Sequence, residues 1–243
     1  MTSFEYLYRA MLLFEHPLYQ RVNGTLRRLA RPLGPDALIL DVGGRRSNYT
    51  IGLPGRVWVS DIPRATALQS KLDLGATDGI VETVTSRRSN VEKYLIDDMT
   101  KSSFPDASFD LVVAIEVLEH VEQDRLFVEN VRRVLRAGGW FVMTTPNGDD
   151  TPEPYPDHKR HYRREQLREL LASFLSDVEV RYCVRDDWFF KKGARKGWNP
   201  RRPLRTLTGM AAFFTAFRLE RIRSVEDRPI GTLHLMASAR RPA

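Results

Sequence analysis

The pattern of hydrophobic and polar positions along the chain predicts helices at the N-terminus, followed by an alternation of short strands and helices. Hydrophobic residues recur at helical spacing across residues 4–31, and the dipeptide His16-Pro17 interrupts that spacing, which predicts two helices. From residue 37 the pattern changes to short apolar segments that end in acidic or polar residues. We predict strands at 37–43, 56–62, 94–98, 109–116 and 139–147.

The segments between these strands indicate the type of sheet. A stretch such as 123–135 has helical periodicity, and strands joined by crossover helices form parallel sheets. The Pro- and acid-rich segment 148–158 predicts a loop. We predict an α/β fold, a doubly wound, mostly parallel, seven-stranded Rossmann-like sheet with N-terminal helices and a helical insertion before the last strand. The remaining predicted elements are a helix at 163–174, a strand at 177–184, a helix at 203–219 and the last strand at 231–239.

Composition narrows the class of protein. Hydrophobic residues make up 42% of the chain and charged residues 28%, as in ordinary globular proteins. The single cysteine, Cys183, excludes an internal disulfide bond and a cysteine-based zinc site. The first twenty residues lack the basic leader and apolar core of a signal peptide, and no segment has the roughly 18 consecutive uncharged apolar residues of a spanning helix. We therefore expect a cytoplasmic protein.

The formal net charge of +7 comes from one segment. Residues 188–205 contain seven Lys and Arg and no acid, which leaves 31 basic residues of 38 against 31 acidic residues in the rest of the chain. Such a patch indicates an anionic partner, namely a phosphate, an RNA backbone or a lipid headgroup. A solvated loop is the alternative explanation. If the partner is a lipid headgroup, we expect the protein at the periphery of a membrane.

Acidic residues and glycines follow the predicted strands. In open α/β sheets, ligands bind beyond the carboxyl ends of the strands. Asp41, Gly43 and Gly44 close the first predicted strand, where glycine lets the backbone approach a ligand. Asp61 lies 20 residues further on, at the spacing at which a carboxylate binds ribose hydroxyls, and Asp98 ends the third strand. Each of these acids alone is also consistent with a helix N-cap.

The order of these motifs resembles the class I S-adenosylmethionine-dependent methyltransferases over residues 36–185. The likeness is strongest in DDMTKSSFPDASFDLVVAIEVLEHV (97–121) and VRRVLRAGGWFVMTTPN (131–147). The resemblance implies S-adenosyl-L-methionine as cofactor, and it assigns a role to each matching residue. Asp41, Gly43 and Gly44 would lie beside the methionine part, Asp61 and Ile62 at the ribose, Asp98 at the adenine amino group, Met99 on the adenine ring, and Ile115 and Glu116 along the wall of the site.

The first glycine loop departs from the family pattern. The family usually has Asp-x-Gly-x-Gly-x-Gly, whereas Arg45 and Ser47 take the second and third glycine positions here, and Pro54-Gly55 shortens the helix expected next. Arg45 or Arg46 is suited to pair with the carboxylate of the cofactor. The alternative is a degenerate, non-catalytic domain that binds S-adenosylmethionine poorly or not at all.

The stretch AIEVLEHVEQ (114–123) carries the strongest candidates for chemistry. If a helix begins at Val117, then Glu116, Glu119 and His120 share one face, and two carboxylates with an imidazole suit Mg²⁺ or another divalent metal. The segment also resembles the metal-dependent small-RNA 2′-O-methyltransferases and, in part, the ubiquinone-pathway O-methyltransferases. That resemblance implies Glu116, Glu119, His120 and His158 as metal ligands. In the alternative, His120 or His158 is a general base without a metal.

These features together predict a function. We expect a methyltransferase of one domain that O-methylates a hydroxyl of a sugar, a lipid-linked glycan or a related small metabolite. A metal-dependent RNA 2′-O-methyltransferase and a non-catalytic binding module are the alternatives. The acceptor is expected to bind between 149–162 and 186–217. The expected parts are N-terminal helices (1–35), the cofactor-binding core (36–185), a basic loop and helix on the acceptor side (186–225) and the last strand (226–243).

Overall fold

The computed structural model describes residues 1–45, 48–65, 75–196 and 201–243 and contains one seven-stranded sheet. The strand order is β3-β2-β1-β4-β5-β7-β6, in which β7 is antiparallel to both of its neighbours and the remaining pairs are parallel. The predicted mostly parallel, doubly wound sheet is therefore confirmed. Its strands are β1 (Leu38–Val42), β2 (Arg56–Asp61), β3 (Val91–Ile96), β4 (Phe109–Ile115), β5 (Leu135–Pro146), β6 (Ser176–Arg185) and β7 (Thr232–Arg240).

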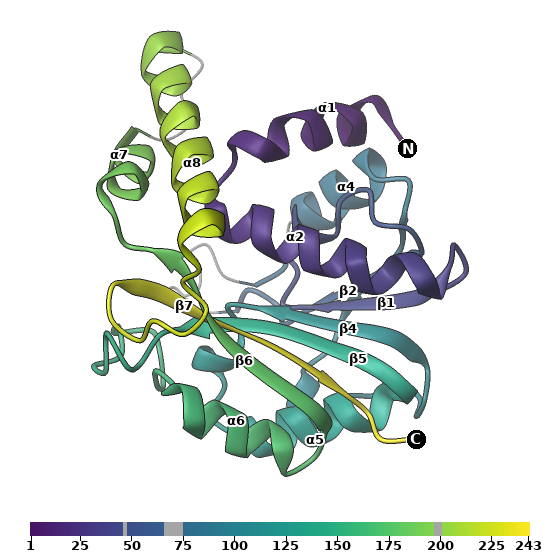
Figure 1. Cartoon of the computed structure of the whole chain (residues 1–243). Coiled ribbons are helices and arrows are strands. Elements are labelled where there is room, and N and C mark those ends of the chain that lie inside the picture. The colour runs from purple at the N-terminus through teal and green to yellow at the C-terminus, as the bar shows by residue number, and fades with distance from the viewer. Residues whose placement is uncertain (46–47, 66–74, 197–200) are drawn as a thin grey trace.

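Helices cover both faces of the sheet (Figure 1). On one face α5 and α6 pack on a core that includes Phe109, Phe141 and Leu167, and on the other face α2 and α4 pack on a core that includes Ile39 and Val113. Helix α1 and the pair α7 and α8 form an outer layer above α2. The α-helices are α1 (Ser3–Met11), α2 (Pro17–Ala30), α4 (Asp78–Arg87), α5 (Asp124–Val134), α6 (Arg164–Ala172), α7 (Trp188–Lys196) and α8 (Pro203–Arg223). Short 3₁₀ turns are η1 (Leu12–Phe14), η2 (Arg31–Leu33), η3 (Asn48–Thr50), η4 (Met99–Lys101) and η5 (Leu118–His120).

The break between the two N-terminal helices has a local cause. Pro17 occupies the first turn of α2, where its missing N–H is not needed, and the His16 side chain accepts a hydrogen bond from the Leu18 N–H. The dipeptide therefore begins the second helix at the predicted place. It also positions the His16 imidazole beneath the outer helical layer, where its ring lies 5.1 Å from that of Phe190 and 5.4 Å from that of Phe213.

Two predicted elements, a loop and a strand, need correction. The predicted basic loop is wrong for residues 188–196, which form α7 because Asp187 accepts a hydrogen bond from the Phe190 N–H and Phe190 packs inward. Trp198 of that predicted loop lies outside the described residues. The third strand spans residues 91–96 instead of 94–98, so Asp98 lies two residues beyond its end.

The crossover from β1 to β2 is shorter than in a regular βαβ unit. Among its described residues, 43–45 and 48–55, the helical structure is limited to the single turn η3. Helix α2 fills the space, because Leu18, Val22 and Leu26 are buried against strand residues on that side of the sheet. An N-terminal helix thereby brings Tyr19 to the end of β1, where it contacts Tyr49. No helix of the described residues is long and apolar enough to cross a membrane.

Candidate functional site

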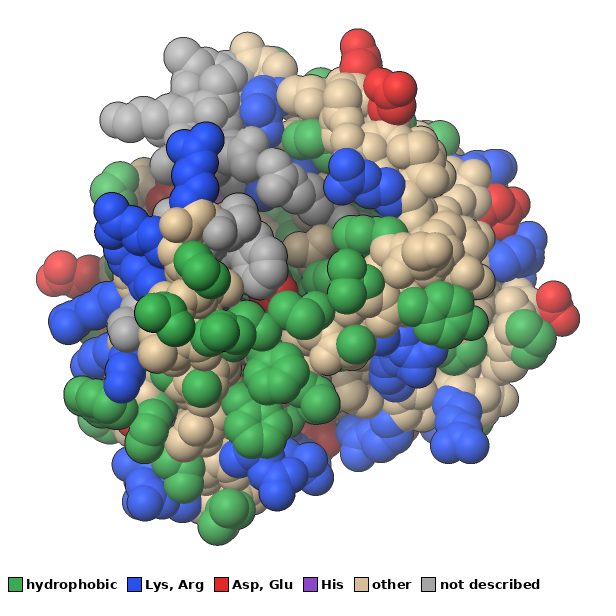
Figure 2. Space-filling model, turned by 90° about the horizontal axis from the view of Figure 1, so that it is seen from above, with side chains coloured by type: hydrophobic (Ala, Val, Ile, Leu, Met, Phe, Trp, Pro, Cys, Tyr) green, Lys and Arg blue, Asp and Glu red, His purple; other side chains and the backbone are tan. Residues whose placement is uncertain are grey.

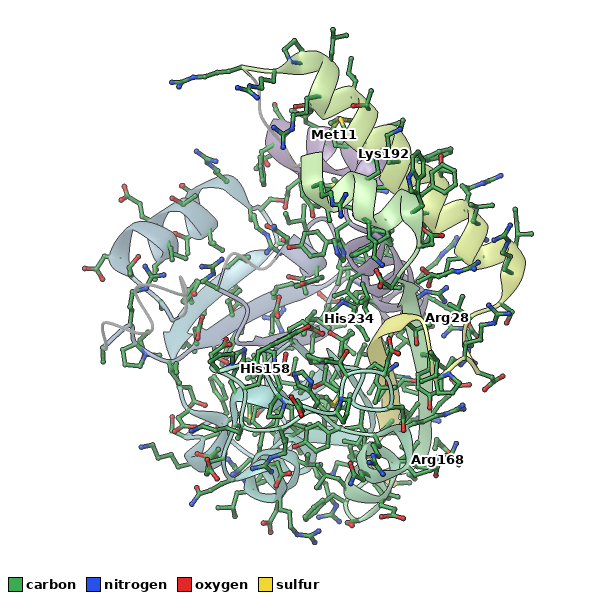
Figure 3. The ribbon with its side chains drawn as sticks, turned by 90° about the vertical axis from the view of Figure 1, so that its left-hand side faces the viewer. Met11, Arg28, His158, Arg168, Lys192 and His234 are labelled. Atoms are coloured by element: carbon green, nitrogen blue, oxygen red, sulfur yellow. The ribbon has the colours of Figure 1, made fainter. Side chains whose placement is uncertain are left out.

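The carboxyl ends of the parallel strands border a cavity of about 450 Å³. Figure 3 looks onto this edge of the sheet and shows His158 and His234 on it, below Met11 and Lys192 of the helical layer. The chain segments that follow β1, β2, β3 and β4 all contribute to the wall. The predicted site residues among the lining are Gly43, Asp61, Ile62, Asp98, Met99, Glu116 and His120.

Asp61 is the last residue of β2, and its side chain is held inside the protein. It is 8% exposed, and its carboxylate accepts a hydrogen bond of 2.8 Å from the Ile62 N–H. Burial raises the pKa of Asp61 to about 6, although hydrogen bonds from the backbone N–H groups of Ile62 and Arg45 offset part of the rise. A buried carboxylate with few donors around it is well suited to accept hydrogen bonds from ligand hydroxyls.

Asp98 and Met99 line the same cavity from η4. One carboxylate oxygen of Asp98 accepts hydrogen bonds from the Thr100 N–H at 3.0 Å and from the Thr100 hydroxyl at 2.8 Å, so Asp98 caps this turn. The capping role considered from the sequence is therefore real, and it coexists with a place in the cavity wall. Met99 is 2% exposed and packs in the core below η4, so its side chain supports the wall instead of standing free in the cavity.

The glycine loop after β1 lies between the larger cavity and a second one of about 280 Å³. Gly43 has a φ of +65°, and a Cβ there would lie 2.6 Å from a Val117 methyl group. A Cβ on Gly44 would lie 2.8 Å from the Asp41 carboxyl carbon, so this close approach requires glycine. The predicted residues Asp41, Gly44 and Ile115 line the second cavity, together with Tyr19, Gly43, Arg45, Asn48 and Tyr49.

Asp41 and Arg45 have structural partners in this loop. The Asp41 carboxylate is 1% exposed and accepts a hydrogen bond of 2.9 Å from the Thr50 hydroxyl, which ties β1 to η3. The Arg45 carbonyl accepts a hydrogen bond of 3.1 Å from the Tyr94 hydroxyl. Arg45 lines both cavities in place of the family's second glycine. Arg46 and Ser47, the other departures from the glycine pattern, lie outside the described residues.

Glu116 leaves β4 in an unusual backbone conformation. Its φ of +55° is rare for a residue other than glycine, and such strain is retained only where the surroundings hold it. Here the Thr144 hydroxyl donates to the Glu116 carboxylate at 2.7 Å, and His234 Nδ1 lies 3.1 Å from its other oxygen. Burial alone would raise the pKa of Glu116, but His234 and the Thr144 hydroxyl outweigh it and lower that pKa.

The predicted four-residue ligand set is not assembled as expected. Residues 118–120 form a single 3₁₀ turn instead of a helix that begins at Val117, and the left-handed Glu116 directs its side chain toward β5 and β7. Among the described residues, the cluster with metal-ligand spacing consists of Glu119, His120 and His158, whose donor atoms lie within 4.8 Å of one another. Glu116 is not part of it.

Glu119 places a buried carboxyl group beside the two imidazoles of this cluster. It is 1% exposed, and neither of its oxygens makes a hydrogen bond of normal geometry within the described chain. Burial and the nearby Glu116 charge raise the pKa of Glu119 well above its ordinary value, and a Thr145 hydroxyl close by offsets only part of this. An unpartnered buried carboxyl beside two imidazoles is a donor set that fits a divalent metal ion.

The imidazoles of the cluster are oriented by backbone and side-chain contacts. His120 Nδ1 lies 3.1 Å from the Asp157 carbonyl oxygen. Because a carbonyl only accepts hydrogen bonds, His120 carries its proton on Nδ1 when neutral and has an unprotonated Nε2. His158 Nδ1 lies 2.8 Å from His161 Nε2, and His161 Nδ1 contacts the Thr151 carbonyl. Burial, followed by the nearby His120, lowers the pKa of His158.

Comparison with known proteins shows similarity to methyltransferases in sequence and in fold. A model described as "Methyltransferase domain" matches residues 69–143, which include Asp98, Glu116 and His120. A Mycobacterium tuberculosis protein named probable S-adenosylmethionine-dependent methyltransferase is 31% identical over 183 residues, covering 65% of this chain and 64% of that protein. Phosphoethanolamine N-methyltransferase 2 of Haemonchus contortus, solved with S-adenosyl-L-methionine, shares the fold at a TM-score of 0.61 and 14% identity, covering 91% of this chain and 52% of that chain.

In sequence and in fold, the chain is similar to the class I S-adenosylmethionine-dependent methyltransferases. A Mycolicibacterium smegmatis protein, also named a probable S-adenosylmethionine-dependent methyltransferase, is 40% identical over 88 residues, which are 34% of this chain and 34% of that protein. The chain thus spans less than two thirds of the length of either curated relative.

Several residues of this candidate site were not predicted from the sequence. Tyr19 comes from α2, Asn48 and Tyr49 from η3, and His234 from β7, and their places depend on how distant elements pack. One signal was present for His234. An imidazole in the apolar strand segment GTLHLMASA is an isolated polar side chain on a buried element, which is a reason to look for a partner.

Proposed function

We propose that this protein binds S-adenosyl-L-methionine and transfers its methyl group to a hydroxyl oxygen of a sugar, a lipid-linked glycan or a related small metabolite. The observation that carries the proposal is the composition of the larger cavity. Asp61 and Asp98 lie in its wall together with Glu116 and with His120, whose Nε2 is free to accept a proton. The names of the curated relatives support methyl transfer, and the basic imidazole supports oxygen as the accepting atom.

The two cavities that share Gly43 and Arg45 suit the two ends of the cofactor. In the larger cavity, the Asp61 carboxylate would accept hydrogen bonds from the ribose hydroxyls, and the wall at Met99 would contact the adenine. The smaller cavity would take the amino-acid end, where the half-buried Tyr19 and Tyr49 rings, 4.8 Å apart between centroids, provide a wall. Gly43 and Gly44 allow the backbone to approach that end closely.

Residues of this chain would orient the acceptor and remove the proton from its hydroxyl group. When bound, the cofactor supplies an activated methyl group on a sulfonium, so the protein must chiefly place the acceptor oxygen in line with it. His120 Nε2 would take the hydroxyl proton as the oxygen attacks. The Asp157 carbonyl holds the other ring nitrogen and so fixes the orientation of the imidazole. Segment 149–162, which carries Asp157, would form one side of the acceptor site.

The test is transfer from methyl-labelled S-adenosylmethionine to a panel of hydroxyl-bearing sugars and glycolipids. A His120→Asn variant retains an amide that can donate to the Asp157 carbonyl but cannot take a proton. We expect its kcat to fall by roughly 10²- to 10⁴-fold with little change in the affinity for S-adenosylhomocysteine. Retained affinity for S-adenosylhomocysteine is the control that the variant is folded and its cofactor site intact. Unchanged kcat in His120→Asn would remove His120 as the base.

A metal-assisted form of the same reaction is the second candidate, favoured by the cluster of Glu119, His120 and His158. These residues would hold a divalent ion, which would lower the pKa of the acceptor hydroxyl. Calorimetric titration of Mn²⁺ or Mg²⁺ into the wild type and Glu119→Gln separates the two forms. Binding that Glu119→Gln removes, together with loss of transfer in EDTA, would support the metal, and full activity in EDTA would leave His120 as the base.

Two further outcomes bear on the alternatives. Tight RNA binding that weakens steeply with salt would favour an RNA 2′-O-methyltransferase, because phosphate contacts release counterions. Failure of the folded protein to bind S-adenosylhomocysteine would favour the degenerate binding module, in which Arg45 disables the glycine loop.

A further inference from the structure

Helix α8 turns several small residues inward and leaves four large hydrophobic residues exposed on its opposite face. The residues that face the protein interior are Thr206, Gly209, Ala212 and Ala216, spaced three or four apart. The opposite face is exposed. There Leu204 is 78% exposed, Leu207 is 59% exposed, Phe214 is 36% exposed and Ile222 is 76% exposed. A surface helix normally has the reverse arrangement, so this apolar face is suited to be covered by something else.

The apolar surface extends from α8 onto the N-terminal segment. The Phe14 ring of η1 lies 5.8 Å from that of Phe214, which joins the two elements. Leu7 of α1 and Leu13 of η1 are 64% and 55% exposed. Figure 2 looks down on this helical layer and shows hydrophobic side chains gathered over its middle with Lys and Arg side chains beside them. We call the surface formed by Leu7, Leu13, Leu204, Leu207 and Phe214 the apolar face.

Cations lie beside the apolar face in a segment of the chain that contains no acidic residue, although Lys191 pairs with Asp186 just before that segment, at 2.9 Å. In the described part of 188–219 there is no Asp or Glu, and Glu220, the next acid, is buried. Lys192 lies over the Trp188 ring at 4.4 Å, an arrangement of aromatic and ammonium groups suited to the interface of a bilayer. The exposed cations of α7 and the start of α8 are Lys191, Arg195, Arg201, Arg202 and Arg205.

We propose that the apolar face and its neighbouring cations dock this protein onto an anionic lipid bilayer surface. Exposed leucines would enter the boundary between headgroups and acyl chains, and the arginines would contact phosphate groups. A second copy of the chain fits less well, since a symmetric contact would bring the same cations against each other. RNA also fits less well, because Leu204 and Leu207 are aliphatic and provide no stacking surface for bases.

Packed aromatic rings connect the helical layer that carries the apolar face to the wall of the candidate site. Phe213 of α8 and Phe190 of α7 both contact the His16 ring, and His16 in turn lies 6.4 Å from the His234 ring, centroid to centroid. His234 contacts Glu116 in the wall of the cavity. A hydroxyl carried on a membrane lipid is then the class of acceptor that docking would bring close to this protein. This last step rests on the proposed function, whereas the docking itself does not.

The test is co-sedimentation with vesicles of phosphatidylcholine alone and with vesicles that also contain phosphatidylglycerol. We expect binding to the anionic vesicles and its loss in high salt. Arg201→Gln, Arg202→Gln and Arg205→Gln together should weaken binding by about 100-fold, from about fivefold for each arginine. Leu204→Ser with Leu207→Ser should weaken it by at least about tenfold. The assay needs neither cofactor nor acceptor, so its outcome is distinguishable from failure of the proposed reaction.

Matched variants on the opposite helical layer serve as controls. Leu126→Ser with Arg132→Gln changes exposed residues of α5 and should leave vesicle binding unchanged. Thermal unfolding would establish that all variants are folded. Absence of binding to anionic vesicles, or binding insensitive to the α8 variants, would overturn the proposal. A dimer in solution that Leu204→Ser and Leu207→Ser disperse, or RNA binding lost in the arginine variant, would assign the face to those partners instead.

Discussion

Replacement of Asp61 by Asn should make the protein more stable and bind its cofactor more weakly. Burial raises the pKa of Asp61 from its ordinary 3.8 to about 6, so the ionised carboxylate is less favourable in the folded chain than in the unfolded chain. At ~1.4 kcal/mol for each pH unit, this difference corresponds to about 3 kcal/mol of lost stability. The loss should develop as pH rises from about 4 to about 6 and remain constant above it. Asp61→Asn keeps the shape, carries no charge and should abolish this pH dependence.

Cofactor binding should change in the opposite direction. Hydrogen bonds to a charged group contribute about 1.5 to 3 kcal/mol each, so loss of the Asp61 carboxylate should weaken S-adenosylhomocysteine binding by at least about tenfold. In the wild type, affinity should fall by up to about tenfold for each pH unit below about 6, because protonation removes the accepting charge. A substitution that weakens ligand binding while it stabilises the fold is typical of a functional residue.

Calorimetric titration with S-adenosylhomocysteine and urea unfolding between pH 4 and 8 would measure both effects. Asp36→Asn is the matched control, since Asp36 is exposed and precedes β1 at the opposite edge of the sheet. It should change neither quantity. An Asp61→Asn variant that binds S-adenosylhomocysteine as tightly as the wild type would refute the assignment of Asp61 to the ribose. A variant with unaltered pH dependence of stability would refute the electrostatic account.

Two predictions concern the scaffold of the site. Gly43→Ala should lower the free energy of unfolding by about 1 to 2 kcal/mol and impair cofactor binding, because its Cβ would lie 2.6 Å from Val117 and its backbone is left-handed. Gly79→Ala in α4 is the control, since a Cβ there meets nothing within 4 Å. It should be neutral or stabilising in the same unfolding assay. Glu220→Ala should lower the free energy of unfolding by about 3 to 5 kcal/mol, because it would leave the Arg21 charge without its buried partner. Glu220 is buried, lies 2.6 Å from Arg21 and accepts a hydrogen bond from the Val184 N–H. A loss below about 1 kcal/mol would show that this ion pair does not stabilise the fold.

Local patterns in the sequence were sufficient for the elements and for part of the site. The strand at 109–116 was predicted correctly because it is a short continuous apolar run, as in strands buried on both faces of a parallel sheet. The helix at 123–135 was predicted correctly because its buried residues recur at helical spacing. Asp61 and Gly43 were predicted to lie at one edge of the sheet because each stands at the carboxyl end of a parallel strand, and the structure has them in one cavity wall. The helix α7 was missed because its cations outweighed the capping residue Asp187 in the pattern.

Side-chain direction and long-range partners were decided only by the tertiary structure. Glu116 and Glu119 are three residues apart, and the sequence alone is compatible with both on one helical face. The left-handed backbone at Glu116, held by Thr144 of β5 and His234 of β7, turns the two carboxyl groups to different partners. Likewise, α8 has apolar residues on both sides, and packing against α7, α2 and η1 determines that the small ones are buried. Periodicity specifies which positions share a face, but which face is covered depends on elements distant in the chain.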